Sequence, residues 1–217
     1  VVRLVGSEMC IRDRFCVKKL SGAIGAELTG VDLTDNLSEE ILVSINEHLV
    51  KYEVVFFRDQ DISWEQHVKL GKFFGPLQSH PAYNSPPNYP EITILESTKD
   101  NPSKIECWHT DMTFLKNPPL CSILRSKICP SKGGDTMWSS MTAAYESLSL
   151  SMKNFLKNLT AEHDFCHGFK ESIAEPGGRE RLKDAIKNNP PVVHPVIRTH
   201  PITCLLYTSP SPRDGLL

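Results

Sequence analysis

Apolar side chains recur three and four positions apart in two early stretches of the chain, which predicts two amphipathic helices. The first begins after Asn36, and Glu39 three residues later fits a capping box. The second begins after Ser63, pairs it with Gln66 in the same way, and ends before Gly75. The apolar stripes are Ile41, Leu42, Ile45 and Leu49 in the first helix, and Val68, Leu70, Phe73 and Phe74 in the second.

Shorter runs rich in β-branched and aromatic residues predict strands between and after these helices. Residues 54–57 form a continuous apolar run, which is typical of a buried strand. Two short helices are predicted over residues 142–148 and 152–159, and a charged, weakly amphipathic one over 175–188. The other strands are predicted over residues 23–33 with a turn inside, 91–95, 107–114, 120–127, the start of 161–169, and 192–198, which Pro195 interrupts.

The predicted strand 107–114 carries a histidine and an aspartate two positions apart. Alternate side chains of a strand point to the same face, so His109 and Asp111 are expected to project together. An imidazole beside a carboxylate supplies two of the three protein ligands of a non-haem Fe(II) centre. With 8 His in 217 residues, a His-x-Asp tripeptide arises by chance roughly one time in three. On the tripeptide alone, a surface histidine beside a solvated carboxylate is the commoner explanation.

Longer motifs surround this pair and give it more weight. Residues 108–114 (WHTDMTF) are followed by Asn-Pro-Pro at 117–119, by GGDTMW at 133–138 and by AAYE at 143–146. In this order they resemble the taurine dioxygenase family of Fe(II)/2-oxoglutarate-dependent enzymes. The resemblance runs from about residue 15 to residue 203, and it includes further motifs at residues 25–33, 54–60, 80–83, 161–165 and 194–201.

This resemblance implies a fold that is mainly β with α, a double-stranded β-helix (jelly-roll) with helices packed outside the sheet. It implies that His109 and Asp111 are catalytic and hold the cofactor Fe(II). It also implies that the Thr136 hydroxyl binds the co-substrate 2-oxoglutarate. On the residues alone, the glycines at 133 and 134 indicate a hairpin turn and assign Thr136 no role.

The resemblance also implies a substrate site. His80 and Tyr83 match the family's receptor for the substrate anion, and Phe169 matches an aromatic residue of the pocket wall. An imidazolium and a phenol are suitable donors to a sulfonate. Without the resemblance, a loop histidine beside a tyrosine is more often a surface cluster, and Phe169 is equally a core residue.

The implied reaction hydroxylates the carbon next to the sulfonate of taurine or a similar alkyl sulfonate and releases sulfite. O2 is consumed, and 2-oxoglutarate is decarboxylated to succinate and CO2. Ile105 departs from the taurine enzymes, which carry a substrate-binding Asn four residues before the metal histidine. The apolar side chain removes a hydrogen-bonding partner, so alkyl sulfates and aryloxyalkanoates remain alternative substrates. A non-catalytic β-helix binding protein remains an alternative function.

Several other aromatic residues invite a site role. Trp138 matches a residue that lines the iron pocket in the family, and it also fits a core position. His163 and His167 match no ligand, so we expect them to be structural or exposed. His194 and His200 are the in-chain candidates for a third metal ligand, although the resemblance supports neither.

The two ends of the chain look unlike the rest. Residues 4–13 and 204–214 can be back-translated as reverse complements of one DNA segment, as expected of a sequencing adapter that flanks an insert. We therefore expect residues 1–14 and 204–217 to be non-native, and residues 15–203 to be the N-terminal and central part of one dioxygenase domain. The second histidine and the 2-oxoglutarate-binding arginine of the family would then lie beyond residue 203. We expect such a chain to be inactive and prone to aggregation through exposed strand edges.

The composition of the chain limits the classes of partner that we expect. A net charge of -2 gives no reason to expect nucleic acid or an anionic membrane as a partner. The sequence has no run of 18 apolar residues, so no transmembrane helix is expected. The cysteines show no metal-binding or disulfide spacing, which favours reduced thiols in the cytoplasm. The expected partners are a small anionic substrate and O2, and a homo-oligomer is left open.

Overall fold

The structure is a computed structural model that describes residues 9–11, 15–100, 102 and 108–208. Its N-terminal part is a four-stranded sheet in the order β1-β2-β3-β4. The strands are β1 (Met9–Ile11), β2 (Phe15–Lys19), β3 (Ala26–Thr29) and β4 (Val55–Phe56). The first two pairings are antiparallel and β3 pairs with β4 in parallel, as a strand connection through a helix requires.

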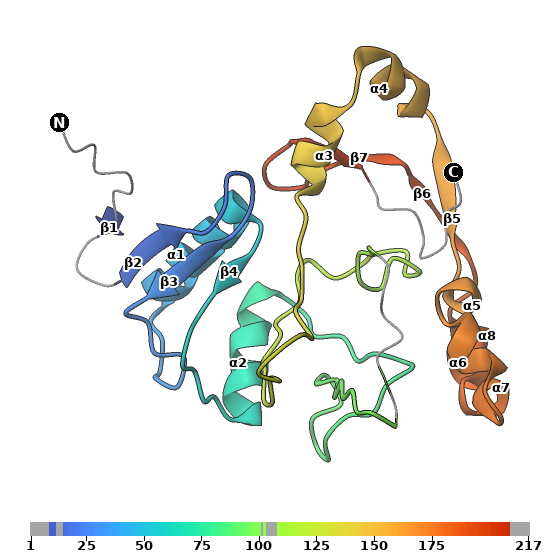
Figure 1. The fold of residues 1–217 in the computed structure, drawn as a ribbon, viewed down its shortest axis with the longest axis horizontal. Helices are drawn as coiled ribbons and strands as arrows, with labels where there is room; N and C mark the ends of the chain where they lie inside the picture. Colours follow the sequence, from blue (N-terminus) through green and yellow to red (C-terminus); the bar gives the residue numbers. More distant parts are fainter. Residues whose placement is uncertain (1–8, 12–14, 101, 103–107, 209–217) are drawn as a thin grey trace.

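Helix α1 (Glu39–Tyr52) provides that connection and covers one face of the sheet (Figure 1). Apolar residues from the sheet, from the segment after β3 and from α1 form one buried core: Val17, Ala26, Leu28, Val31 and Ile45. The helix begins later than predicted, because its N-cap is Ser38 and not Asn36. The Asn36 side chain accepts a hydrogen bond from Lys69 instead. The prediction of a capping box at Asn36 and Glu39 is therefore wrong.

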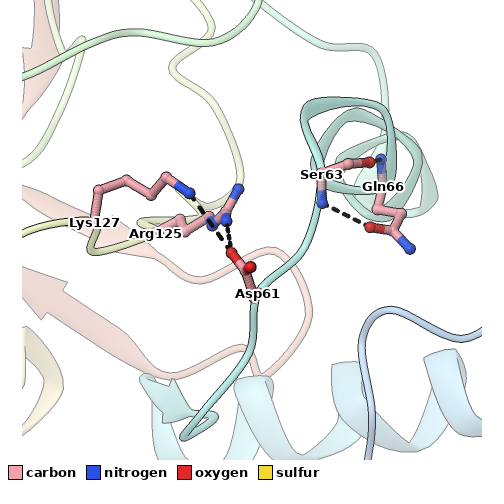
Figure 2. Close-up of polar contacts among 5 residues, drawn as sticks. All are labelled: Asp61, Ser63, Gln66, Arg125 and Lys127. Atoms are coloured by element: carbon pink, nitrogen blue, oxygen red, sulfur yellow. Dashed lines mark hydrogen bonds and ion pairs between the residues drawn. The ribbon is translucent and has the colours of Figure 1, made fainter.

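Helix α2 (Trp64–Phe74) begins as predicted. The Gln66 amide N–H donates to Ser63 Oγ at 3.1 Å, and the Ser63 amide N–H donates to Gln66 Oε1 at 2.6 Å (Figure 2). This reciprocal pair satisfies two amide groups that a helix start leaves without intrahelical partners. The helix ends at Gly75, whose φ of 139° lies outside the helical region. The predicted capping box and the glycine stop are both confirmed.

The segments predicted as strands at 91–95 and 120–127 are irregular, so these two predictions are wrong. A strand exists only where a neighbouring strand accepts its backbone hydrogen bonds. Residues 120–127 contact the region around α2 instead. His67 Nε2 lies 3.1 Å from the Ile123 carbonyl oxygen. Asp61 pairs with Arg125 and, at 3.6 Å, with Lys127 (Figure 2).

The C-terminal part contains helices and two small antiparallel sheets. Strand β5 (Thr160–His163) pairs with β6 (Val192–Pro195), and β7 (Ile197–Thr199) pairs with β8 (Leu206–Thr208). The predicted strand 192–198 is thus broken at Val196 and not at Pro195, which belongs to β6. The helices are α3 (Met141–Ser147), α4 (Leu150–Leu156), α5 (Phe165–Gly168), α6 (Lys170–Ala174), α7 (Gly178–Arg181) and α8 (Lys183–Asn188).

The single helix predicted over residues 175–188 is two short helices, α7 and α8, which meet at Leu182. This region carries the second buried core, formed by Phe114, Phe165, Leu182 and Ala185. Phe114 comes from the segment that carries His109 and Asp111, and the other three residues come from the region α5 to α8, so this core attaches that segment to the helices. In the described part of the chain, every helix is too short or too polar to cross a membrane.

Candidate functional site

The His109–Asp111 motif lies on an irregular segment that ends in a turn, and we call residues 108–115 the motif turn. Residues 108–110 are irregular and residues 111–114 form turns, so the prediction of a strand over 107–114 is wrong for the described residues, which exclude Cys107. Met112 adopts a left-handed φ of 52°. The Leu115 amide N–H donates to the Met112 carbonyl at 3.0 Å, which closes the turn within the chain. In the described part of the chain, residues 108–114 pair with no strand.

The turn nevertheless brings the two predicted ligands together. His109 Nε2 lies 3.3 Å from Asp111 Oδ1, and Ser122 Oγ donates to Asp111 Oδ2 at 3.1 Å. The His109 hydrogen bond is the largest of the effects that lower the pKa of Asp111, and the Ser122 hydrogen bond adds to it against the cost of burial. Asp111 is therefore a carboxylate at neutral pH. The side chains of His109 and Asp111 are 35% and 53% exposed, so the pair is open to ligands from solvent.

The three predicted substrate residues also converge, although they come from distant segments. The ring centroids of His80 and Tyr83 lie 4.6 Å apart. The Phe169 ring centroid lies 5.5 Å from that of His80 and 5.9 Å from that of Tyr83. Phe114 packs edge-on against Phe169 at 6.3 Å. Because Phe114 belongs to the motif turn, this aromatic cluster lies directly beside the His109–Asp111 pair.

The electrostatics link His80 to the same pair. Burial lowers the pKa of His80, while the negative charge of Asp111 acts to raise that pKa. His80 Nδ1 accepts the Ala82 amide N–H at 3.1 Å, so a neutral His80 carries its proton on Nε2 and can donate one hydrogen bond. The expected imidazolium is therefore disfavoured in the protein without substrate. A bound anion would favour it.

In the described part of the chain, Thr136 makes no hydrogen bond with these site residues. It is an exposed residue in the loop after Gly133 and Gly134, which both have positive φ values, of 72° and 73°. The contacts of Asp111 are with His109 and Ser122 instead. Trp138 packs edge-on against Phe56 of β4 at 5.2 Å but is 39% exposed, so it is not a buried core residue.

The remaining histidines make other contacts. His163 is buried and His167 exposed, as expected. His200 Nδ1 accepts the amide N–H groups of Ile202 and Thr203, at 3.2 Å and 3.1 Å. His194 Nε2 lies against two carbonyl oxygens of the motif turn, which no sequence signal indicates because 79 and 81 residues separate the partners.

The donor set fits part of an Fe(II) centre. An imidazole nitrogen and a carboxylate oxygen meet at one accessible place, as two ligands of a two-histidine, one-carboxylate centre must. No group of three or more His, Cys, Asp or Glu side chains that could hold a metal occurs among the described residues. The described chain thus offers two ligands. Ile105, the departure noted in the sequence, lies outside the described residues.

An open depression of about 350 Å³ lies beside the turn. Met112 and Leu115 of the turn form part of its wall, and Ser79 and Pro81, on either side of His80, form another part. The depression therefore lies between the segment that carries His80 and the segment that carries His109 and Asp111. It is lined by chain neighbours of His80 and Asp111 and not by His80, His109 or Asp111 themselves.

Comparisons with known proteins agree on one family. Residues 17–216 match the sequence profile described as Taurine catabolism dioxygenase TauD, TfdA family. An alkylsulfatase of Acinetobacter baylyi is 35% identical over 191 residues, which are 86% of this chain and 60% of that protein. An alpha-ketoglutarate-dependent sulfate ester dioxygenase of Pseudomonas putida is 31% identical over 191 residues, 86% of this chain and 63% of that protein.

A solved structure gives the same answer for the fold. The crystal structure of a taurine dioxygenase from Burkholderia xenovorans has a TM-score of 0.71 and 35% identity, over 91% of this chain and 63% of that one. The predicted fold class, a jelly-roll with flanking helices, is confirmed by this similarity. The chain spans about 60% of the length of the relatives that it matches.

Proposed function

We propose an activity from the premise that this chain belongs to the taurine catabolism dioxygenase TauD, TfdA family. The whole protein acts as an Fe(II)- and 2-oxoglutarate-dependent dioxygenase. The observation that carries this proposal is the 3.3 Å approach of His109 Nε2 to Asp111 Oδ1 beside the cluster of His80, Tyr83 and Phe169.

His109 and Asp111 would hold Fe(II), which when bound supplies the activation of O2 that couples substrate hydroxylation to the conversion of 2-oxoglutarate into succinate and CO2. Asp111 contributes a negative charge that stays ionised because His109 and Ser122 hold its pKa low. A third ligand comes from outside the described residues. Thr136 is proposed as a donor to 2-oxoglutarate, since its side chain is exposed.

The substrate is proposed to be an alkyl sulfonate such as taurine, hydroxylated on the carbon next to sulfur so that sulfite leaves. His80 Nε2–H and the Tyr83 hydroxyl would bind the anion, and Phe169 would contact the alkyl chain. Alkyl sulfates are the second candidate, because the two relatives above are named as an alkylsulfatase and a sulfate ester dioxygenase. Hydroxylation of the carbon that carries the ester oxygen would release sulfate.

The test is succinate formation by the protein at the full length of its relatives, supplied with Fe(II), 2-oxoglutarate and one candidate substrate at a time. Taurine, hexanesulfonate, hexyl sulfate and a phenoxyalkanoate separate the classes, and the inorganic product is identified as sulfite or sulfate. We expect succinate and sulfite in equal amounts with a sulfonate, and none with Asp111→Ala. Sulfate release from hexyl sulfate alone would favour the second candidate. Tight binding of these anions without succinate would favour a binding protein.

A further inference from the structure

We propose that His194 is a positioning residue for the His109–Asp111 pair: its imidazole N–H holds the turn that carries both groups. The expected effect on metal binding rests on the proposed function. The expected effect on the backbone of the turn does not. His194 lies on β6, and only 6% of its surface is exposed. It is therefore a fixed part of the β5–β6 sheet rather than a mobile surface group.

The hydrogen bonds of His194 show which nitrogen carries the proton. Its Nε2 lies 2.9 Å from the Thr113 carbonyl oxygen and 3.0 Å from the Leu115 carbonyl oxygen. Both partners are acceptors, so Nε2 must be the N–H donor, shared between them. This geometry commits Nε2 to the backbone. His194 is therefore unsuited to supply Nε2 to a metal, which argues against the third-ligand role considered from the sequence.

The two carbonyls lie in the part of the turn that fixes Asp111. Thr113 follows Asp111 by two residues, and the Leu115 N–H already closes the turn on Met112 at 3.0 Å. Between them, the Phe114 side chain is buried and packs edge-on against Phe165 at 5.1 Å. The turn is thus held on one side by an apolar anchor and on the other by a single shared donor. Removal of the donor leaves the Phe114 anchor and the Leu115–Met112 hydrogen bond, but it frees the Thr113 and Leu115 carbonyl groups.

His163 provides a matched comparison on the neighbouring strand. Its ring is 1% exposed and lies 5.0 Å from the His194 ring, edge to face. Both of its ring nitrogens are buried without a hydrogen-bond partner in the described part of the chain. His163 therefore supports the His194 ring by packing alone. An aromatic ring without nitrogen should replace it without effect on the turn.

The test compares His194→Gln with His194→Asn in the 217-residue chain. The Gln side-chain N–H reaches about as far as imidazole Nε2, whereas the Asn N–H reaches only about as far as Nδ1. Amide hydrogen exchange at residues 112–115 reports the turn without any metal. Titration with Co(II) reports the pair, and His163→Phe is the control for a changed ring in the same place.

We expect His194→Asn to accelerate amide exchange at residues 112–115 by about tenfold or more and to weaken Co(II) binding by about tenfold, the lower end of the effect of groups that orient metal ligands. His194→Gln should retain most of the slow exchange and most of the Co(II) affinity. His163→Phe should change neither the exchange rate nor the Co(II) affinity. Unchanged amide exchange in His194→Asn would overturn the proposal. Equal losses of slow exchange and Co(II) affinity in His194→Gln and His194→Asn would overturn it as well. If the unsubstituted chain binds no Co(II) while His194→Asn still accelerates exchange, the positioning holds and the proposed metal site fails.

Discussion

Two buried histidines on adjacent strands differ in what their ring nitrogens do. His194 Nε2 donates to two carbonyls of the motif turn, whereas His163 leaves both nitrogens without a hydrogen-bond partner among the described residues. A buried polar atom without a partner costs roughly 1–3 kcal/mol of stability. Burial also lowers the pKa of His163, and the nearby His194 and Arg198 lower it further. His163 is thus a neutral ring that the fold tolerates.

Replacement of His163 by Phe should therefore leave the free energy of unfolding unchanged or raise it by up to about 1 kcal/mol, because it removes two unsatisfied nitrogens and keeps the ring. Urea unfolding monitored by circular dichroism measures the change. Loss of more than about 2 kcal/mol would show that a His163 nitrogen has a partner that stabilises the fold.

Acidification should destabilise the chain through one buried and two half-buried histidines. Burial is the largest effect that lowers the pKa of His67, His80 and His163 below the ordinary value of 6.5. The unfolded chain then binds more protons than the folded chain below that value, so stability falls as the pH falls. The lowered pKa of Asp111 acts only nearer its ordinary value of 3.8, well below this range.

The thermal midpoint should accordingly decrease between about pH 7.5 and about pH 5.5, and the decrease should be smaller in His163→Phe, which removes one of these groups. Scanning calorimetry at matched ionic strength measures both slopes. A midpoint that rises on acidification would contradict the burial of these imidazoles.

Among the helices, local sequence predicted α2 better than α1. Ser63 and Gln66 form a capping box that needs no contact outside four consecutive residues. Asn36 has the right chemistry for a cap, but its side chain binds Lys69 of α2, and the helix begins after Ser38. A contact between distant segments decided the start of α1, and no local pattern could have shown it.

The cap of α2 can be tested by itself. Ser63→Ala should lower the free energy of unfolding by about 1 kcal/mol, since the Gln66 amide N–H loses its acceptor. Ser63→Asp supplies an equivalent acceptor and should retain most of the stability. Equal stability of the Ala and Asp variants would contradict the capping interaction.

The close contact between α6 and the start of α7 depends on a glycine. A Cβ on Gly178 would lie 2.0 Å from the Ser172 carbonyl oxygen, closer than any real contact, and the opposing atom is backbone. Gly178→Ala should therefore destabilise the chain by about 2 kcal/mol or more by overpacking. Gly22→Ala is the control, because a Cβ there meets nothing within 4 Å. Urea unfolding of both variants makes the comparison. Similar stability for the two would contradict the close approach at Gly178.

At the scale of the whole molecule, sequence predicted the family and the fold class better than it predicted the strands. Residues 91–95 and 120–127 have strand-like patterns, but the described structure gives them no strand partners. The strand argument for His109 and Asp111 was also wrong, yet a turn brings the pair together. Ser122 was given no role, and His194 was considered only as a metal ligand, because their contacts with the turn join segments that the local pattern treats separately.

The central claim is that His109 and Asp111 together bind a divalent metal. The most direct measurement is Co(II) titration of the 217-residue chain, followed by calorimetry and by the visible absorption of the bound metal. Asp61→Ala is the matched control, since that carboxylate pairs with two basic side chains, Arg125 and Lys127 (Figure 2). We predict that Asp111→Ala weakens Co(II) binding by about tenfold or more and that Asp61→Ala does not, because Asp111 is the proposed ligand and Asp61 is not. Equal Co(II) affinity of Asp111→Ala and the unsubstituted chain would contradict the account.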